Sequence, residues 1–190
     1  EVAHERQQRL FCPSSIAVFG PNTPAVAPQE TPLHPTTMYG VTKVAGEILC
    51  DYWFQRYGVD VRGVRYPGLI SWKAPPGGGT TDYAIAIFHA ALRDGSYECF
   101  VSPATRLPMM YMDDAIRGTL GLMNAPFKAL NHHADFNLGA MSFKASDLAD
   151  AIAQRVPGFT CSYAPDARQA IANSWPDAVD DSAARDEWGW

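Results

Sequence analysis

A tyrosine and a lysine four residues apart form the pattern in this sequence with the clearest chemical potential. Tyr39 and Lys43 stand in the segment YGVTK. On a helix, residues four apart share one face, so the phenol and the ammonium are expected to point into the same space. A nearby cation stabilises the phenolate, which can take the proton of an alcohol while a hydride leaves the alcohol carbon. A hydroxyl such as that of Ser15, at the end of a neighbouring strand, could hold the alcohol oxygen for that transfer.

Taken alone, this pair has a plain structural alternative, a surface lysine packed over a half-buried tyrosine. The context favours the chemical interpretation, because the pair opens a predicted helix and follows a predicted strand that ends in the segment SSIAVFG. The sequence therefore predicts that Ser15, Tyr39 and Lys43 act together on a small alcohol.

The elements that must position these residues alternate between strands and helices. Strands are predicted at 11–20, running into a turn, and at 59–66, 136–138 and 159–163, whereas 109–112 is a short apolar run. The first predicted helix runs from Thr36 or Thr37 to Tyr57, and the second covers 85–92 and ends near Gly95. A third helix is predicted to start at a cap formed by Asp113 or Asp114. Two more are predicted at 146–156 and at 181–190. Such alternation predicts an α/β fold with parallel strand pairing.

Two loops between these elements are candidates for ligand contact. The proline-rich stretch 21–35 has irregular spacing, which favours an active-site loop over a polyproline ligand. In the loop from Ala74 to Gly79, three successive glycines permit close backbone approach to a ligand, although they suit a flexible linker equally well. Thr80 and Thr81 follow where a helix is expected to start, so their N–H groups could bind a carboxylate or serve only as a cap. Trp175 fits a core position more readily than a lid.

Composition excludes several classes of function. The net charge is −5 and no basic run occurs, which argues against nucleic acid as a partner. No apolar stretch approaches the roughly 20 residues that cross a bilayer, so no membrane partner is expected. The four cysteines lie far apart without a C-x-x-C pair, which favours reduced thiols. The adjacent His132 and His133 lack the spacing of metal ligands, and no metal is predicted.

The catalytic pattern and several longer segments of the sequence resemble those of a known family. Ser15, Tyr39 and Lys43 resemble the catalytic residues of the short-chain dehydrogenase/reductase superfamily, and SSIAVFG with the later RYPG resembles its extended, UDP-sugar epimerase-like branch. Within that branch, four longer segments resemble the NAD-dependent L-threonine 3-dehydrogenases: RYPGLIS, PGGGTTDYA, TRLPMMYMDDAIRGT and RQAIANSWP. The resemblance runs from Pro13 to the C-terminus.

The resemblance implies an oxidoreductase that converts L-threonine to 2-amino-3-oxobutanoate, the route of threonine catabolism to glycine, and passes the hydride to NAD. Tyr39 is then the general base, Lys43 supports it and hydrogen-bonds the nicotinamide ribose, and Ser15 orients the substrate oxygen. It assigns to the cofactor Ser14, Tyr39, Lys43, Tyr66, Pro67 and Leu69, and to the substrate Ser15, Tyr39, Gly79, Thr80, Thr81 and Trp175. It also implies a homodimer paired through the 37–57 helix, and a cytoplasmic or, in a eukaryote, mitochondrial-matrix location.

One part of the family pattern is missing. The sequence has no G-x-x-G-x-x-G or G-x-G-x-x-G fingerprint between a first strand and helix, on which dinucleotide binding depends in this fold. The expected fold is therefore the C-terminal half of a Rossmann-like doubly wound parallel sheet with a small α/β substrate lobe, as part of a longer protein. Residues 1–72 are predicted to belong to the NAD-binding domain and 73–190 mainly to the substrate lobe, with 109–124 and 134–140 returning to the first.

Two alternatives stay open at this stage. A sugar-nucleotide epimerase or dehydratase shares Ser15, Tyr39 and Lys43 but needs basic groups for two phosphates, for which Arg106 is the obvious candidate. The other alternative is a truncated, non-catalytic fragment, in which case titration of NAD into the chain as it stands should show no binding.

Overall fold

The computed structural model describes residues 2–73 and 75–190. Glu1, the first residue of the predicted NAD-binding unit, and Ala74, the first of the predicted glycine-rich loop, lie outside the described residues. No helix in the described ranges is long and apolar enough to cross a membrane.

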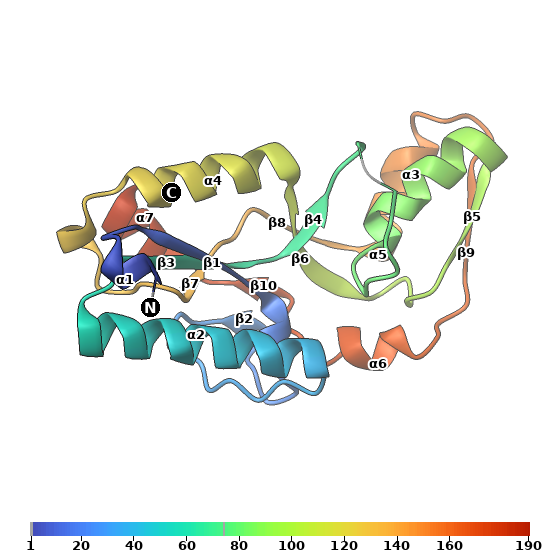
Figure 1. The fold of residues 1–190 in the computed structure, drawn as a ribbon. Coiled ribbons are helices and arrows are strands. Elements are labelled where there is room, and N and C mark those ends of the chain that lie inside the picture. Colours follow the sequence, from blue (N-terminus) through green and yellow to red (C-terminus); the bar gives the residue numbers. More distant parts are fainter. Residues whose placement is uncertain (1, 74) are drawn as a thin grey trace.

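A parallel sheet with helices on both faces forms the left half of the molecule in Figure 1. The sheet has the order β1-β3-β7, from β1 (Leu10–Ser15), β3 (Val61–Tyr66) and β7 (Phe136–Asn137), and all its pairings are parallel. Helix α2 (Met38–Tyr57) lies along one face and α4 (Met112–Asn124) along the other. Residues 61–65 are all buried, as expected for a strand covered on both sides.

Helix α2 is the element that carries the predicted phenol and ammonium, and its bounds agree with the sequence prediction. The Thr37 hydroxyl accepts the N–H of Gly40 at 3.0 Å and caps the N-terminus. At the other end Gly58 adopts φ 65°, a left-handed conformation that glycine takes without strain and that terminates the helix.

A second group of elements forms the right half of the molecule (Figure 1). Its sheets pair β4 (Gly68–Ile70), β6 (Arg106–Tyr111) and β8 (Met141–Lys144) in the order β4-β6-β8, and β5 (Ser96–Cys99) with β9 (Thr160–Tyr163). Its helices are α3 (Tyr83–Asp94), α5 (Ala145–Ala153) and α6 (Arg168–Ala172). The core of this half contains the fully buried Tyr83, Leu107 and Met109. The remaining elements are α1 (Val2–Glu5), η1 (Ile16–Val18), β2 (Val26–Ala27), η2 (Phe127–Ala129), β10 (Ala178–Val179) and α7 (Ser182–Trp188).

The chain thus has the predicted α/β class, a partial Rossmann-like parallel sheet joined to a smaller α/β lobe. The two halves meet where β3 leads into β4, with only Pro67 between them. Proline has no N–H to give to a sheet ladder, so the ladder is interrupted there.

Three local predictions were wrong. The strand predicted to run toward Gly20 ends at Ser15, because the Ser15 hydroxyl accepts the N–H of Ala17 at 3.2 Å and starts the short helix η1. Asp113 and Asp114 do not cap α4, whose N-cap is Tyr111; they lie in its first turn, where carboxylates favour the helix dipole. The predicted tail helix covers only 182–188, since Gly189 takes a positive φ.

Candidate active site

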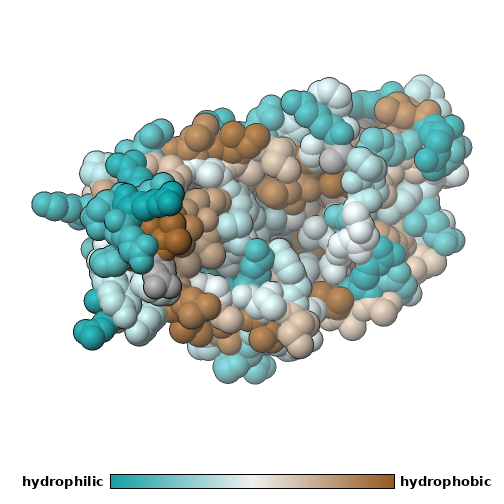
Figure 2. Space-filling view, in the orientation of Figure 1, coloured by the Kyte–Doolittle hydropathy of each residue, from teal (hydrophilic) through white to brown (hydrophobic). Residues whose placement is uncertain are grey.

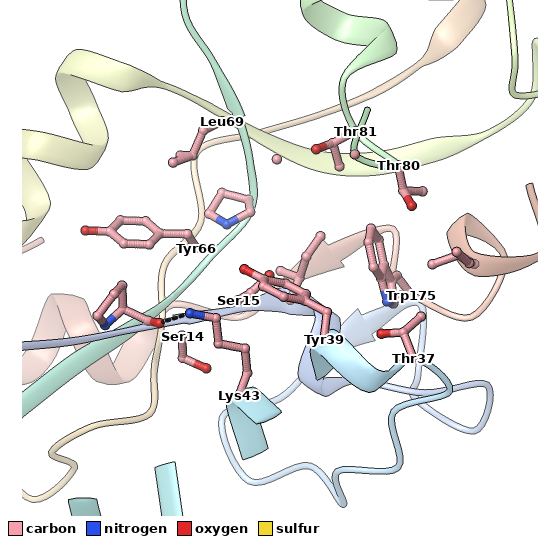
Figure 3. Close-up of a pocket in the computed structure, with 16 residues that line it drawn as sticks. Ser14, Ser15, Thr37, Tyr39, Lys43, Tyr66, Leu69, Thr80, Thr81 and Trp175 are labelled. Atoms are coloured by element: carbon pink, nitrogen blue, oxygen red, sulfur yellow. Dashed lines mark hydrogen bonds between the residues drawn. The ribbon is translucent and has the colours of Figure 1, made fainter. Parts of the chain in front are cut away.

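A pocket of about 520 Å³ lies at the carboxyl ends of β1 and β3, where an open α/β sheet binds its ligands. Every residue that the sequence assigned to chemistry, cofactor or substrate lines this pocket. These residues are Ser14, Ser15, Tyr39, Lys43, Tyr66, Pro67, Leu69, Gly79, Thr80, Thr81 and Trp175. Figure 3 shows that they come from both halves of the molecule.

Tyr39 and Lys43 lie on the same face of α2, as the four-residue spacing predicts. The Lys43 ammonium lies 5.4 Å from the centre of the Tyr39 ring and donates a hydrogen bond to the Pro13 carbonyl at 2.6 Å (Figure 3). Tyr39 is 56% exposed, so its hydroxyl is accessible from the pocket. The pair therefore combines an accessible phenol with a cation held beside it.

The first turn of α2 lies close to η1, the short helix that directly follows Ser15. A Cβ atom added at Gly40 would lie 2.1 Å from the carbonyl oxygen of Ala17, so only glycine permits this approach. Ser15 accepts one hydrogen bond from the backbone, and its own O–H stays available to donate to a ligand. Glycine between Tyr39 and the rest of α2 thus brings the phenol and the serine hydroxyl to the same pocket.

Ser14 borders the pocket, but its hydroxyl has another partner. The Ser14 O–H donates to the buried carboxylate of Glu47, and the side chain is 3% exposed. Ser14 therefore contributes its backbone to the pocket wall, and its hydroxyl could donate to a cofactor only if this hydrogen bond broke.

The backbone around Pro67 forms the wall opposite α2. The Tyr66 ring points away from the pocket (Figure 3), and its hydroxyl is hydrogen-bonded to Thr119 on α4. Burial raises the pKa of Tyr66, against the opposing effect of this hydrogen bond, so this tyrosine is protonated at neutral pH. Gly68 allows Thr81 to pack against the wall, because a Cβ there would lie 2.8 Å from the Thr81 side chain.

The glycine-rich loop differs from its prediction. The N–H groups of Gly77, Gly78 and Gly79 all donate to one carboxylate oxygen of Asp82, at 2.7, 2.8 and 2.8 Å. They are therefore not free to bind a substrate carboxylate, and only Gly79 of the three lines the pocket. Helix α3 begins at Tyr83, so Thr80 and Thr81 lie in the turn before it and not at its start.

Trp175 is both a core residue and a pocket residue, two positions that the sequence presented as alternatives. Its ring packs against the core of the second half and also against the cluster that contains Ile16, Val18 and Phe19. It thus joins the two halves beside the pocket (Figure 3). Five further residues line the pocket that were not predicted to do so: Pro13, Ile16, Thr37, Gly68 and Ile171. Thr37 was predicted only as a cap, and Ile16, Gly68 and Ile171 stand in the family-like segments SSIAVFG, RYPGLIS and RQAIANSWP without a role of their own.

No group of three or more His, Cys, Asp or Glu side chains suited to a metal occurs in residues 2–73 and 75–190. His132 has carboxylate partners instead, with Nδ1 2.5 Å from Glu187 and Nε2 3.1 Å from Glu30. Burial alone lowers the pKa of His132, but these carboxylates outweigh it and raise the pKa above its ordinary value.

Comparisons with known proteins agree with this geometry. Residues 1–139 match the NAD dependent epimerase/dehydratase family. The chain is 52% identical over 192 residues to an uncharacterized epimerase/dehydratase of Staphylococcus aureus, and the match covers 100% of the chain and 60% of that protein.

Two solved structures superpose closely. A monomeric L-threonine 3-dehydrogenase from a metagenome has a TM-score of 0.96 and 57% identity, with 99% of this chain and 61% of that one covered. The GalE-like L-threonine dehydrogenase from Cupriavidus necator has a TM-score of 0.97 and 55% identity, with 100% and 69% covered. The chain thus spans about 60% of the length of the curated relative that it matches.

Proposed function

The chain belongs to the NAD dependent epimerase/dehydratase family, and on that premise we propose that it is the catalytic part of a longer protein that oxidises L-threonine to 2-amino-3-oxobutanoate. The single observation that carries the proposal is the arrangement of the pocket. Ser15, Tyr39 and Lys43 line it from one side, and Gly79 to Thr81 line it from the other lobe. The pocket thus offers an alcohol-oxidising set and, opposite to it, small polar residues suited to an amino acid.

The family depends on NAD, and the residues of the pocket suit the nicotinamide half of that cofactor. An ammonium carries three N–H donors, of which Lys43 gives one to Pro13, so two are left for ribose hydroxyls. Tyr66 and Pro67 line the pocket, but the Tyr66 ring points away from it (Figure 3), which leaves room for a flat ring. When bound, NAD supplies the acceptor for the hydride of the substrate carbon.

The chain's own residues would then hold and deprotonate the alcohol. Ser15 donates a hydrogen bond to the β-hydroxyl oxygen of L-threonine and fixes it near Tyr39. The Tyr39 phenolate, stabilised by the Lys43 ammonium, takes the hydroxyl proton as the carbon loses its hydride. The product is the ketone, and the proton remains on the Tyr39 oxygen until it passes to solvent, to which this residue is exposed.

The far side of the pocket favours a small zwitterion over a sugar nucleotide. Lys43 is the one cationic side chain among the described residues that line the pocket. Arg106, the predicted phosphate ligand of the epimerase alternative, donates to the Ser142 carbonyl at 2.9 Å and lies 3.7 Å from Asp147. It does not line this pocket, so the charge that a UDP group requires is not presented there.

The deciding experiment compares two substrates on the full-length protein that contains this chain. Reduction of NAD should be followed with L-threonine, and epimerisation should be followed with UDP-galactose. We expect saturable NAD reduction with L-threonine and no turnover of UDP-galactose. Epimerisation without threonine oxidation would overturn the proposal in favour of a sugar-nucleotide enzyme.

A further inference from the structure

Glu47 is a buried carboxylate that the proposed reaction does not use, and it is hydrogen-bonded to Ser14 in the pocket wall. It lies on α2, one turn after Lys43, and is 5% exposed. Its partner Arg65, on β3, is 4% exposed and binds it with two nitrogens, Nε at 3.0 Å and Nη2 at 2.8 Å. The hydroxyl of Ser14, on β1, donates to the same carboxylate. One side chain thus connects the helix to two strands.

These three elements are the ones that carry the predicted catalytic residues. Tyr39, Lys43 and Glu47 follow at intervals of four on α2, so they form one row along the face that meets the sheet. Lys43 donates to the Pro13 carbonyl, and Glu47 accepts from the next residue, Ser14. The residue after that is Ser15. Two successive residues of β1 are therefore fixed to two successive turns of α2.

The same carboxylate also fixes the opposite wall. Arg65 immediately precedes Tyr66 and Pro67, which line the pocket. Movement of Glu47 would therefore alter the position of α2 relative to both backbone segments that border the reacting groups. A buried ion pair is often no more stabilising than an apolar replacement, so stability alone is a weak reason for a charge at this place.

We propose that Glu47 is a positioning residue, which sets the height of Tyr39 and Lys43 over Ser15 through Ser14 and Arg65. The inference rests on the proposed function, since it assigns a role in alcohol oxidation. Arg65 retains other partners when Glu47 is removed: the Gln29 carbonyl at 3.2 Å, the Asn137 side chain at 3.3 Å and the Phe19 ring. Variants of Glu47 are therefore expected to fold.

The test compares Glu47→Gln and Glu47→Ala in the full-length protein. The amide keeps the shape and can still accept from Ser14 and Arg65, whereas alanine removes every contact. A misplacement of about 1 Å can cost about a hundredfold in rate, so Glu47→Ala should lower kcat by about that factor with little change in the KM for L-threonine. Glu47→Gln should recover most of this loss in kcat.

A matched control separates positioning from stability. Arg62 lies on the same strand, is fully buried and pairs with Asp60 at 2.7 Å, but it does not line the pocket. Asp60→Ala also deprives a buried arginine of its carboxylate, and it should lower thermal stability while kcat stays near the wild-type value. An equal loss of kcat in both variants, or an unchanged kcat in folded Glu47→Ala, would overturn the proposal.

A structural measurement keeps this inference independent of the substrate. In a crystal structure of Glu47→Ala, the hydrogen bond from Lys43 to the Pro13 carbonyl should be broken or lengthened beyond about 3.5 Å. If the wild-type protein does not oxidise L-threonine but this bond is lost in the variant, the proposed function fails and the positioning role stands. If the bond is intact, the positioning role fails whatever the substrate.

Discussion

At the scale of single residues, Tyr39 can be changed with little effect on the core, because it is 56% exposed at the rim of the pocket. We predict that Tyr39→Phe lowers kcat for L-threonine oxidation by about 10²–10⁴-fold, the usual contribution of a general base. The KM for L-threonine should change little, and the thermal unfolding temperature should stay within about 2 °C of the wild type. Steady-state kinetics and calorimetry on the full-length protein check both.

Tyr52 supplies a matched control for this prediction. It lies on the same helix and is 51% exposed, but it does not line the pocket. Tyr52→Phe should leave kcat unchanged. A Tyr39→Phe variant as active as Tyr52→Phe would show that another group takes the proton.

Residues of the pocket were predictable from the sequence where they follow a helical spacing or stand in a segment that resembles a known family. Tyr39 and Lys43 follow from helix periodicity, and Gly79 to Thr81 follow from a segment that resembles a known family. The role of Glu47 was not predicted, because it depends on contacts with Arg65 and Ser14, which lie 18 and 33 residues away in the sequence. The hydrogen bond from Ser14 to Glu47 was not predicted for the same reason, since this buried partner cannot be identified from the strand sequence.

At the scale of elements, Asp82 determines the shape of the glycine-rich loop. We predict that Asp82→Ala raises the KM for L-threonine by about tenfold with a smaller change in kcat. Three N–H groups lose a charged acceptor, each such bond being worth about 1.5–3 kcal/mol, and Gly79 and Thr80 lose their fixed place at the pocket. Initial-rate kinetics on the full-length protein measure the effect.

Asp94, at the opposite end of α3, serves as the control for Asp82. Its carboxylate pairs with the neighbouring Arg93 at the surface and lines no part of the pocket. Asp94→Ala should leave KM unchanged. An unchanged KM in Asp82→Ala as well would mean that the loop does not position the substrate.

Helix α7 contacts the loop before β7 through two ionisable side chains, Glu187 and His132. The His132 ring is hydrogen-bonded to Glu187. Burial is the largest single influence on both groups and by itself lowers the pKa of His132 and raises that of Glu187. Their mutual contact and further partners together outweigh burial, so the pKa of His132 is raised and that of Glu187 is lowered. A raised histidine pKa contributes stability that is complete below about pH 6.5 and lost as pH rises through the raised value. A lowered glutamate pKa contributes stability that is present above about pH 4.3 and lost below it as pH falls through the lowered value.

We therefore predict that the substitution His132→Gln lowers the free energy of unfolding, relative to wild type, by more near pH 5.5 than near pH 8.5. Urea unfolding at the two pH values measures this difference. His133 gives a control of opposite sign, since burial lowers its pKa and wild type should lose stability relative to His133→Gln on acidification. Equal losses for His132→Gln at both pH values would contradict the account.

Elements with strong local signals were predictable, and elements that depend on distant pairing were not. Helix α2 has a threonine cap, apolar periodicity and a terminal glycine, and its predicted bounds were correct. The strands β4 and β8 were not predicted, because β4 has only three residues and both strands form by pairing with β6. Such short strands carry no alternation long enough to detect.

At the scale of the whole molecule, α2 exposes an apolar row that bears on assembly. Its members Val41, Ile48, Leu49 and Tyr52 are 48–63% exposed, and Figure 2 shows hydrophobic surface along this edge. Buried against a second copy, such a row would gain about 25 cal/mol per Å² of apolar area. We propose that the full-length protein forms a homodimer through α2.

Substitution of Ile48 by lysine should then convert the dimer to monomer at micromolar concentration, as sedimentation velocity would show. Leu92, which is 82% exposed on α3 in the other half, provides the control, and Leu92→Lys should not change the sedimentation coefficient. A wild-type protein that already sediments as a monomer would contradict this proposal.

The overall architecture followed from the order of the elements, because strands alternating with helices specify a parallel α/β sheet. The place where the two halves join did not follow from it. Pro67 separates β3, in one sheet, from β4, in another, and Trp175 packs against both cores, a combination that only the folded chain reveals.

The most direct test of the central claim is a crystal structure of the full-length Tyr39→Phe variant with NAD and L-threonine. We predict that the β-hydroxyl of threonine lies within about 3.2 Å of the Ser15 hydroxyl and faces the ring edge of the substituted side chain, with the amino-acid group against Gly79 to Thr81. A threonine whose hydroxyl lies out of reach of Ser15, with residues 79–81 free of ligand, would contradict it.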